Sequence, residues 1–365
     1  MSQTVNSGAF LEWLKNEDIA CKNVSFHKKA LLEWAKELRR GSWNEIQDCL
    51  EDVTKRCNEI EYDDNQVFAY VLLHFLDRYY RSWVTYEYLL EKKMLPLKDN
   101  IRLMDIGTGP GPSQYAYSDL LMASKMFSGS DNSQTQGDWF VNRGCTFDYA
   151  EKSLSFREFL HYYSEILLKK GCPTYVPFHH GTYYDAEELD FKGKIVRYEY
   201  SPWAIRTINL RVKQSYNIII YSNFLTTEDA VDHYREQIKR GAFYLKNKGI
   251  ILIISGDPDS PKYKPIYEKI DKIINETKYA TRLFKGSCTK VLGPHPLNYS
   301  RQCNEARIIA DFHKNVFENM EQSTEEALPD CIAEGIKKEI EGIGQEKWWI
   351  TVYKRFSRFR GQKHL

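Results

Sequence analysis

Hydrophobic residues in the first hundred positions recur every three or four residues, the spacing of a helix with one buried face. The clearest runs are residues 31–38 (LLEWAKEL) and 68–76 (FAYVLLHFL). The acidic pair at 63–64 can cap the helix that contains the second run. Residues 1–97 are therefore predicted to form an α-helical region without strands.

From residue 101 the pattern changes to short apolar runs separated by stretches with helical spacing. This alternation is typical of a mostly parallel sheet with crossover helices. The strongest runs, rich in branched and aromatic side chains, are residues 101–106 (IRLMDI), 216–221 (YNIIIY), 250–254 (IILII) and 348–353 (WWITVY). A weaker run at 146–149 (TFDY) precedes an expected helix at 154–168.

The predicted architecture is α/β. A Rossmann-like domain with a mostly parallel seven-stranded sheet is expected over residues 98–365, after the helical region 1–97. Residues 304–345 have helical spacing again and are expected to be an insertion before the last strand. A chain of 365 residues is long enough for such a core with an appendage.

Composition adds little to this picture. Hydrophobic residues make up 42%, charged residues 28%, and the formal net charge is +1, so no global field attracts nucleic acid or an anionic membrane. The eight cysteines include no C-x-x-C pair. The N-terminus has no signal-peptide pattern, and no stretch reaches the roughly 18 apolar residues of a membrane span. A soluble, unprocessed, cytoplasmic protein is expected.

The most specific motif is LMDIGTGPG at 103–111, a strand followed by a glycine-rich turn that opens a helix near Pro112. Glycines let the backbone turn sharply and approach a ligand. A dinucleotide site would need G-x-G-x-x-G, whereas Pro112 and Ser113 follow the third glycine here. The carboxylate of Asp105, which precedes the glycines, also suits a cofactor with a positively charged sulfonium better than a cofactor with a negatively charged diphosphate. The alternative is a strand-to-helix turn without a ligand.

A second acid is expected where the following strand ends, because a carboxylate there can accept hydrogen bonds from both hydroxyls of a ribose. Glu151 in CTFDYAE is the favoured residue, with Asp148 and then Glu199 as alternatives. The competing interpretation is that Glu151 only caps the next helix.

The stretch HHGTYYD supplies Asp185 as a candidate for the adenine edge. His179 and His180 in the same stretch have no nearby cysteine or carboxylate in a familiar ligand spacing. No metal site is predicted.

Ser222 and Asn223 follow the YNIIIY strand, at the sheet edge where cofactor and substrate should meet. Asn223 is the candidate catalytic residue, because methyl transfer needs mainly proximity and alignment and an amide can orient a nucleophilic nitrogen. Equally, Asn223 can serve only the turn. The segment lacks the Asp/Asn-Pro-Pro-Tyr/Phe tetrapeptide of amino-methylating enzymes, and no Pro-Cys pair offers a nucleophile for carbon methylation.

Two basic clusters interleaved with aromatic residues are candidate RNA-binding sites, since such clusters can hold phosphates and stack on bases. The cationic residues are Arg78, Arg81, Lys354, Arg355, Arg358 and Arg360. The first cluster, at 78–83, is also placed to overhang a cofactor site. A solvated charge run is the alternative for the C-terminal cluster.

Taken in order, these motifs resemble the class I, Rossmann-fold S-adenosylmethionine-dependent methyltransferases over roughly residues 100–356. The segments that carry the resemblance are LMDIGTGPGP, CTFDYAE, YNIIIYSNFL, IILIISGDP and WWITVYKRF. The helical region before the core and SGDPDSPKY also resemble the ribosomal small-subunit methyltransferase-like proteins. That family binds an iron–sulfur centre with a cysteine cluster, where this chain has only Cys288 and Cys303, so the cluster and the ribosomal role are in doubt.

The resemblance implies an enzyme that uses S-adenosylmethionine to methylate RNA or a ribonucleoprotein component. It assigns the methionine end of the cofactor to Asp105, Gly107, Thr108, Gly109 and Gly111, the ribose to Glu151, the adenine edge to Asp185, and the floor near the methyl group to Ser222 and Asn223. The first alternative is a non-catalytic assembly protein that keeps the cofactor pocket. The second is a small-molecule methyltransferase, favoured if the N-terminal helices close an aromatic pocket.

Overall fold

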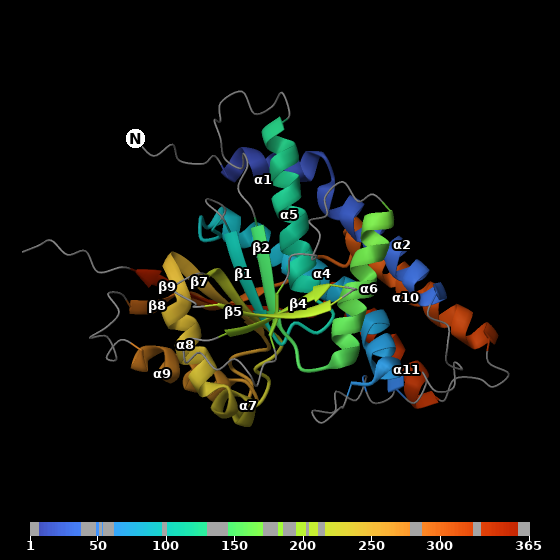
Figure 1. Cartoon of the computed structure of the whole chain (residues 1–365). Helices are drawn as coiled ribbons and strands as arrows, with labels where there is room; N and C mark the ends of the chain where they lie inside the picture. Colours follow the sequence, from blue (N-terminus) through green and yellow to red (C-terminus); the bar gives the residue numbers. More distant parts are fainter. Residues whose placement is uncertain are drawn as a thin grey trace, which may run out of the picture.

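The structure is a computed structural model of the whole chain (Figure 1), and the description is confined to the residues that follow. They are residues 7–37, 49–50, 53, 62–96, 101–129, 145–170, 182–184, 195–201, 204–210, 216–277, 287–323 and 330–356.

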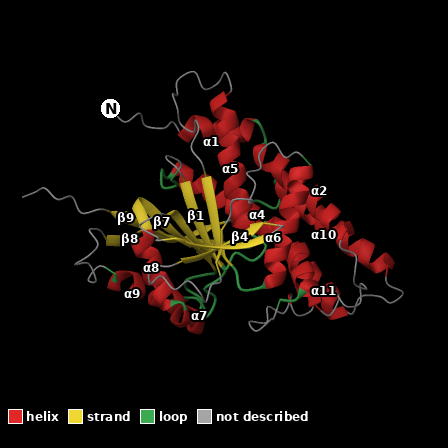
Figure 2. Cartoon of the chain, viewed as in Figure 1, coloured by secondary structure: helices red, strands yellow, loops and turns green. Residues whose placement is uncertain are grey.

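A mixed sheet of nine strands lies at the centre of the described chain (Figure 2). In spatial order the strands are β5 (Ala204–Leu210), β4 (Ile195–Ser201), β3 (Thr182–Tyr184), β2 (Cys145–Ala150), β1 (Ile101–Ile106), β6 (Tyr216–Ser222), β7 (Leu245–Ser255), β9 (Trp348–Phe356) and β8 (Ser287–Leu297). Adjacent strands from β3 to β7 are parallel, whereas β4 and β9 run against both of their neighbours.

The predicted α/β class is confirmed, but the expected mostly parallel sheet of seven strands is wrong, because half of the neighbouring strand pairs in the nine-stranded sheet are antiparallel. Strands β4 and β5 form an antiparallel pair that extends the sheet beyond β3. An edge strand leaves its outer N–H and C=O groups open to such pairing. The five predicted strands correspond to β1, β2, β6, β7 and β9, with β7 beginning earlier than expected, at Leu245.

Helices cover both faces of the sheet (Figure 1). The described helices are α1 (Ser7–Asn16), α2 (Ile19–Glu37), α4 (Asp64–Glu91), α5 (Pro112–Gly129), α6 (Leu154–Lys169), α7 (Glu228–His233), α8 (Arg235–Tyr244), α9 (Lys264–Glu276), α10 (Asn304–Ser323) and α11 (Asp330–Gly342). Ile218 and Ile220 of β6 pack in the core shared with the N-terminal helices, while Ile219 and Tyr221 pack in the core shared with α7, α8 and α9. The alternation follows from the two-residue period of a strand.

Helix α4 is the longest helix in the described chain, and local sequence sets its start. The side chain of Asp63 accepts the backbone N–H of Gln66, and the Gln66 side chain accepts the N–H of Asp63. This reciprocal capping box satisfies two donors that the helix itself leaves open. The prediction that the acidic pair at 63–64 caps this helix is confirmed.

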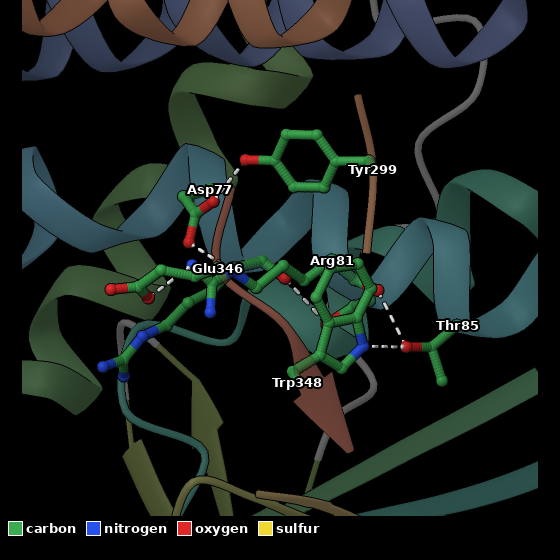
Figure 3. A network of polar contacts seen from close by, with 8 residues as sticks. Asp77, Arg81, Thr85, Tyr299, Glu346 and Trp348 are labelled. Carbon is green, nitrogen blue, oxygen red and sulfur yellow. Dashed lines mark hydrogen bonds and ion pairs between the residues drawn. The ribbon is translucent and has the colours of Figure 1, made fainter. Parts of the chain in front are cut away.

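Polar contacts join α4 to the segment that leads into β9 (Figure 3). Arg81 pairs with Asp77 at 2.6 Å and with Glu346 at 3.1 Å. The indole N–H of Trp348 donates to the hydroxyl of Thr85 at 3.0 Å. A helix near the start of the chain is thereby tied to its last described strand.

A buried network around His27 joins the N-terminal helices to the helices of the α/β core. Its ring nitrogens lie 2.9 Å from a carboxylate oxygen of Asp119 in α5 and 2.8 Å from the hydroxyl of Tyr163 in α6. Tyr79 of α4 donates to the same carboxylate oxygen at 2.7 Å. Four helices are connected through these side chains, and the division into domains 1–97 and 98–365 stays a prediction.

The described helices bear on two further predictions from the sequence. Helices α10 and α11 lie within the predicted insertion 304–345. Among the helices that the structure describes, none is long and apolar enough to cross a membrane.

Candidate functional site

The glycine-rich loop follows β1 at the centre of the sheet, where Asp105 lies between Tyr149 of β2 and Ile220 of β6. Asp105 is 1% exposed, and one of its carboxylate oxygens accepts the hydroxyl of Thr108 at 2.8 Å. The other oxygen has no hydrogen-bond partner among the described residues. Burial raises the pKa of Asp105 to about 7, although its hydrogen bond from Thr108 opposes the shift.

Three glycines of this loop have positive φ angles, of 66° at Gly107, 54° at Gly109 and 76° at Gly111. Residues with a Cβ are strained in this left-handed region. A Cβ at Gly107 would lie 1.9 Å from the ring of Phe224, whereas a Cβ at Gly109 would have no neighbour within 4 Å. The backbone of Gly109 therefore borders open space, which is what close approach of a ligand requires.

Glu151 stands directly after β2, as predicted, and its carboxylate bonds to the loop after β1. One oxygen accepts the N–H of Gly109 at 2.7 Å, and the other accepts the N–H of Ser153 at 2.9 Å. Burial raises the pKa of Glu151, opposed by these backbone donors. The bond to Ser153 also fits the helix-capping interpretation, because Ser153 precedes α6. A carboxylate has about four acceptor positions, so each oxygen can still accept a further donor.

The alternatives to Glu151 are less well placed. Asp148 is buried within the sheet, where it accepts hydrogen bonds from Arg102 at 2.7 Å and from the hydroxyl of Tyr216 at 3.0 Å. Glu199 lies in β4. Asp185, His179 and His180 lie outside the described residues.

Ser222 and Asn223 end β6 beside the same loop, as predicted. The backbone of Asn223 has a φ of 52°, and its N–H donates to the carbonyl of Ile254 at 2.9 Å. A non-glycine residue with a positive φ is uncommon, and asparagine adopts it more readily than most residues. The backbone of Asn223 therefore has a role in the turn. Its side chain is exposed and remains part of the candidate site.

A cavity of about 200 Å³ brings most of these residues together. Of the predicted site residues, its lining includes Gly107, Thr108, Gly109, Glu151, Ser222 and Asn223. Asp105 and Gly111 are not in the lining; a Cβ at Gly111 would instead lie 2.7 Å from Leu160. The carboxyl ends of β1, β2 and β6 meet here, where the chain order of the sheet reverses, and ligands bind α/β sheets at such points.

The lining also contains residues that the sequence did not assign to the cofactor site. These are Tyr62, Tyr70, Arg78, Pro110, Pro112, Ser113, Lys152, Phe156, Phe224 and Tyr234. The sequence predicted that Arg78 binds RNA or, alternatively, lies over the cofactor site. Tyr70 and Arg78 are eight residues apart on α4, about two helical turns, so a helix reading could have placed them on one face.

Aromatic rings form one wall of the cavity. The rings of Tyr62, Tyr70 and Phe156 contact one another with centroid distances of 4.9 to 5.5 Å. On another part of the lining, the rings of Phe224 and Tyr234 lie 4.7 Å apart. Edge-to-face and tilted contacts of this kind are favourable and fix ring positions. Tyr62 and Tyr70 of the N-terminal region therefore contribute aromatic rings to the cavity that contains the glycine loop.

The donor set fits S-adenosylmethionine. The oxygen of Asp105 without a partner and the loop glycines suit the methionine end, which carries an ammonium group and needs close backbone approach. Glu151 keeps acceptor capacity for the ribose hydroxyls. Among the described residues, no cluster of His, Cys, Asp and Glu is arranged to hold a metal ion.

The described residues proposed for RNA differ in their contacts. Arg81 is engaged with Asp77 and Glu346. Arg355 is buried and donates to the carbonyl of Leu245 at 3.0 Å, while Lys354 is half-buried on β9. Burial lowers the pKa of Arg355. Arg358 and Arg360 lie outside the described residues, so RNA binding stays a prediction.

Comparison with known proteins gives structural similarities only. No family model matches the chain, and no curated protein matches it. Phosphoethanolamine N-methyltransferase 2 of Haemonchus contortus, solved with S-adenosyl-L-methionine, is 14% identical with a TM-score of 0.38, and the match covers 85% of this chain and 60% of that enzyme. The matched region is thus less than two thirds of the Haemonchus enzyme.

Two other solved structures are similar in the same way. An S-adenosylmethionine-dependent methyltransferase from Geobacter sulfurreducens, in complex with S-adenosyl-L-homocysteine, is 10% identical with a TM-score of 0.39, covering 85% of this chain and 98% of that one. A putative sarcosine dimethylglycine methyltransferase from Galdieria sulphuraria is 12% identical with a TM-score of 0.37, covering 76% and 84%. Nothing in the comparisons supports the narrower ribosomal resemblance. In structure, the chain is distantly similar to class I S-adenosylmethionine-dependent methyltransferases.

Proposed function

We propose that this chain is an S-adenosylmethionine-dependent methyltransferase that acts on a small molecule. The observation that carries the proposal is the single cavity that joins the glycine loop after β1, Glu151 after β2, and Ser222 and Asn223 after β6. Three motifs that are far apart in the sequence meet there because parallel strands end at the same sheet edge.

The residues of the cavity divide into groups by their position. The backbone of Gly107 to Gly109 would hold the methionine end of the cofactor, with Asp105 buried behind this loop and bonded to Thr108, and Glu151 would accept the ribose hydroxyls. When bound, S-adenosylmethionine supplies a methyl carbon that the acceptor's lone pair attacks, while the carbon–sulfur bond breaks with its electron pair passing to sulfur. Ser222 and Asn223 lie where they would align the acceptor.

The proposal that the acceptor is a small molecule rests on the side chains that the N-terminal region contributes to the cavity. Tyr62 and Tyr70 bring aromatic rings to the cavity together with Phe156 of α6. A pocket lined by aromatic side chains with a few polar groups is typical of small-ligand sites. Arg81 and Arg355, two of the cations proposed for RNA, are held by partners inside the chain. The sequence motifs alone favoured RNA, whereas this lining favours the small molecule.

The test is isothermal titration of the protein with S-adenosylmethionine, alongside Asp105→Ala and Glu151→Ala. Saturable binding by the wild type that weakens at least tenfold in both variants is expected, because Glu151→Ala removes a carboxylate of the lining and Asp105→Ala removes the acceptor that holds Thr108 of the glycine loop. Glu158→Ala is the matched control, since Glu158 is an exposed carboxylate of α6 outside the cavity. Absence of binding at millimolar ligand would overturn the proposal. Binding without formation of S-adenosylhomocysteine in the presence of acceptors would instead indicate the non-catalytic assembly protein.

A further inference from the structure

Arg78 brings a positive charge from α4 into the cavity that also contains the glycine loop. Its guanidinium donates to the hydroxyl of Tyr70 and lies 4.8 Å from the centroid of the Tyr70 ring. The Tyr70 ring is itself held by Tyr62 and Phe156. Stacking on a fixed ring preorganises a guanidinium, so less side-chain entropy is lost when an anion binds it.

The described lining of the cavity carries side chains of both charges. Arg78 and Lys152 are cationic, and Glu151 is the acidic residue of the described lining. Both oxygens of Glu151 already accept backbone N–H groups. S-adenosylmethionine would add a further net positive charge, because its sulfonium and ammonium outnumber its carboxylate. At the short distances within one cavity, the net positive charge of the cofactor, with the guanidinium of Arg78 in the same lining, favours an anionic acceptor over a cationic amine.

We infer that the methyl acceptor is a small anionic molecule, with its carboxylate or phosphate bound by Arg78 and its flat or apolar body against the wall of Tyr62, Tyr70 and Phe156. The inference rests on the proposed function and adds the substrate class to it. Arginine presents paired N–H donors whose spacing matches carboxylate and phosphate oxygens. Lys152 is exposed at the cavity and contributes a second, more screened charge.

The experiment compares four probes that share one ring and differ in the head group. The protein saturated with S-adenosylhomocysteine is titrated with benzoate, phenyl phosphate, benzamide and benzylammonium. Benzoate or phenyl phosphate is expected to bind at least tenfold more tightly than benzamide and benzylammonium, and the two anions distinguish a carboxylate acceptor from a phosphate acceptor. Equal binding of the neutral or cationic probe, or binding of none of the four, would overturn the inference.

Variants assign the preference to Arg78. Arg78→Gln is expected to abolish the tenfold preference for the anions, whereas Arg78→Lys keeps part of it because the charge remains. Arg307→Gln on the exposed surface of α10 is the matched control and keeps the full preference. Titration of Arg78→Gln with S-adenosylhomocysteine separates two roles: a large loss of cofactor affinity would assign Arg78 to the cofactor's own carboxylate and would contradict the inference.

Failure of the inference and failure of the proposed function are distinguishable in this design. A wild-type protein that does not bind S-adenosylhomocysteine fails the proposed function. A wild-type protein that binds S-adenosylhomocysteine but does not prefer the anionic probes keeps the proposed function and loses the anionic acceptor.

Discussion

The carboxylate of Glu151 accepts the backbone N–H of Gly109 at 2.7 Å. The two residues belong to the turns after β2 and β1, which are adjacent parallel strands. An N–H group at a glycine-rich turn otherwise has few acceptors within the chain. The acid of one turn therefore holds the glycine loop of the other in place before any ligand is considered.

Removing this acceptor is expected to loosen the loop. In Glu151→Ala, the N–H of Gly109 loses its partner, so the amides of Gly107, Thr108, Gly109 and Gly111 should exchange with deuterium at least tenfold faster than in the wild type. That factor corresponds to about 1.4 kcal/mol, within the range for a hydrogen bond to a charged group. Hydrogen exchange followed by mass spectrometry measures it. Glu158→Ala serves as the control, and unchanged exchange in Glu151→Ala would show that the bond does not order the loop.

The raised pKa of Asp105 predicts a pH-dependent stability. Burial raises it from 3.8 to about 7 in the folded protein, so between these values the folded state binds more protons than the unfolded state. Asp105 therefore contributes stability at acid pH that is lost as the pH rises through about 7. From pH 5 to pH 8, the wild type should lose on the order of 2 kcal/mol relative to Asp105→Asn.

Urea unfolding of both proteins at the two pH values makes this measurement. The difference between the proteins isolates Asp105, because all other titrating groups are shared. A difference that stays constant, or one that grows in favour of the wild type at pH 8, would contradict the buried neutral carboxyl.

Two glycines of the same loop should respond differently to alanine. Gly109→Ala meets open space and is expected to cost about 1–2 kcal/mol, the strain of a left-handed residue. Gly107→Ala has the same strain and also places its Cβ 1.9 Å from Phe224, so it should be the more destabilising change. Urea unfolding compares them. Equal losses would mean that Phe224 moves aside without cost.

Because the φ of Asn223 is positive, glycine is a better replacement than alanine for testing whether the Asn223 side chain takes part in methyl transfer. Asn223→Ala should lower stability by about 1 kcal/mol, since alanine tolerates this conformation less well than asparagine. Asn223→Gly should stay closer to the wild type, because glycine adopts positive φ without strain. Thermal unfolding measures both. With stability retained, a loss of methyl transfer in Asn223→Gly reports on the side chain alone; a glycine variant less stable than the alanine variant would contradict this account.

The contacts of Arg81 predict a structural role for that residue. Its side chain is 20% exposed and that of Asp77 is 14% exposed, so Arg81→Gln leaves a largely buried carboxylate without its cation. A loss of about 3 kcal/mol is expected in urea unfolding. Lys22→Gln is the control, because the pair of Lys22 with Glu17 is exposed and should contribute less than about 1 kcal/mol. A loss in Arg81→Gln no larger than that of the control would leave Arg81 available for other partners.

Strand prediction succeeded where the local pattern was strong and failed where a strand is short or interrupted by glycine and proline. Strands β1, β6 and β7 each contain a run of mostly apolar residues that is buried on both faces, so their composition alone identifies them. Strand β8 was missed because it contains Gly293 and Pro294, residues that central strands exclude and edge strands tolerate. Strand β3 has three residues, too few for an alternating pattern.

By itself, the sequence determined the α/β class, the capping box at the start of α4, and the placing of Asp105 near the end of a strand and of Glu151 and Asn223 directly after strands, because caps, turns and apolar runs are encoded by neighbouring residues. Only the tertiary structure decided that Arg78 enters the cavity, whereas Arg81, three residues later on the same helix, is paired with Asp77 and Glu346. Both arginines belong to one basic cluster in the sequence. Their different partners depend on which side of α4 faces the glycine loop and which faces β9, and that is set by packing between residues far apart in the chain.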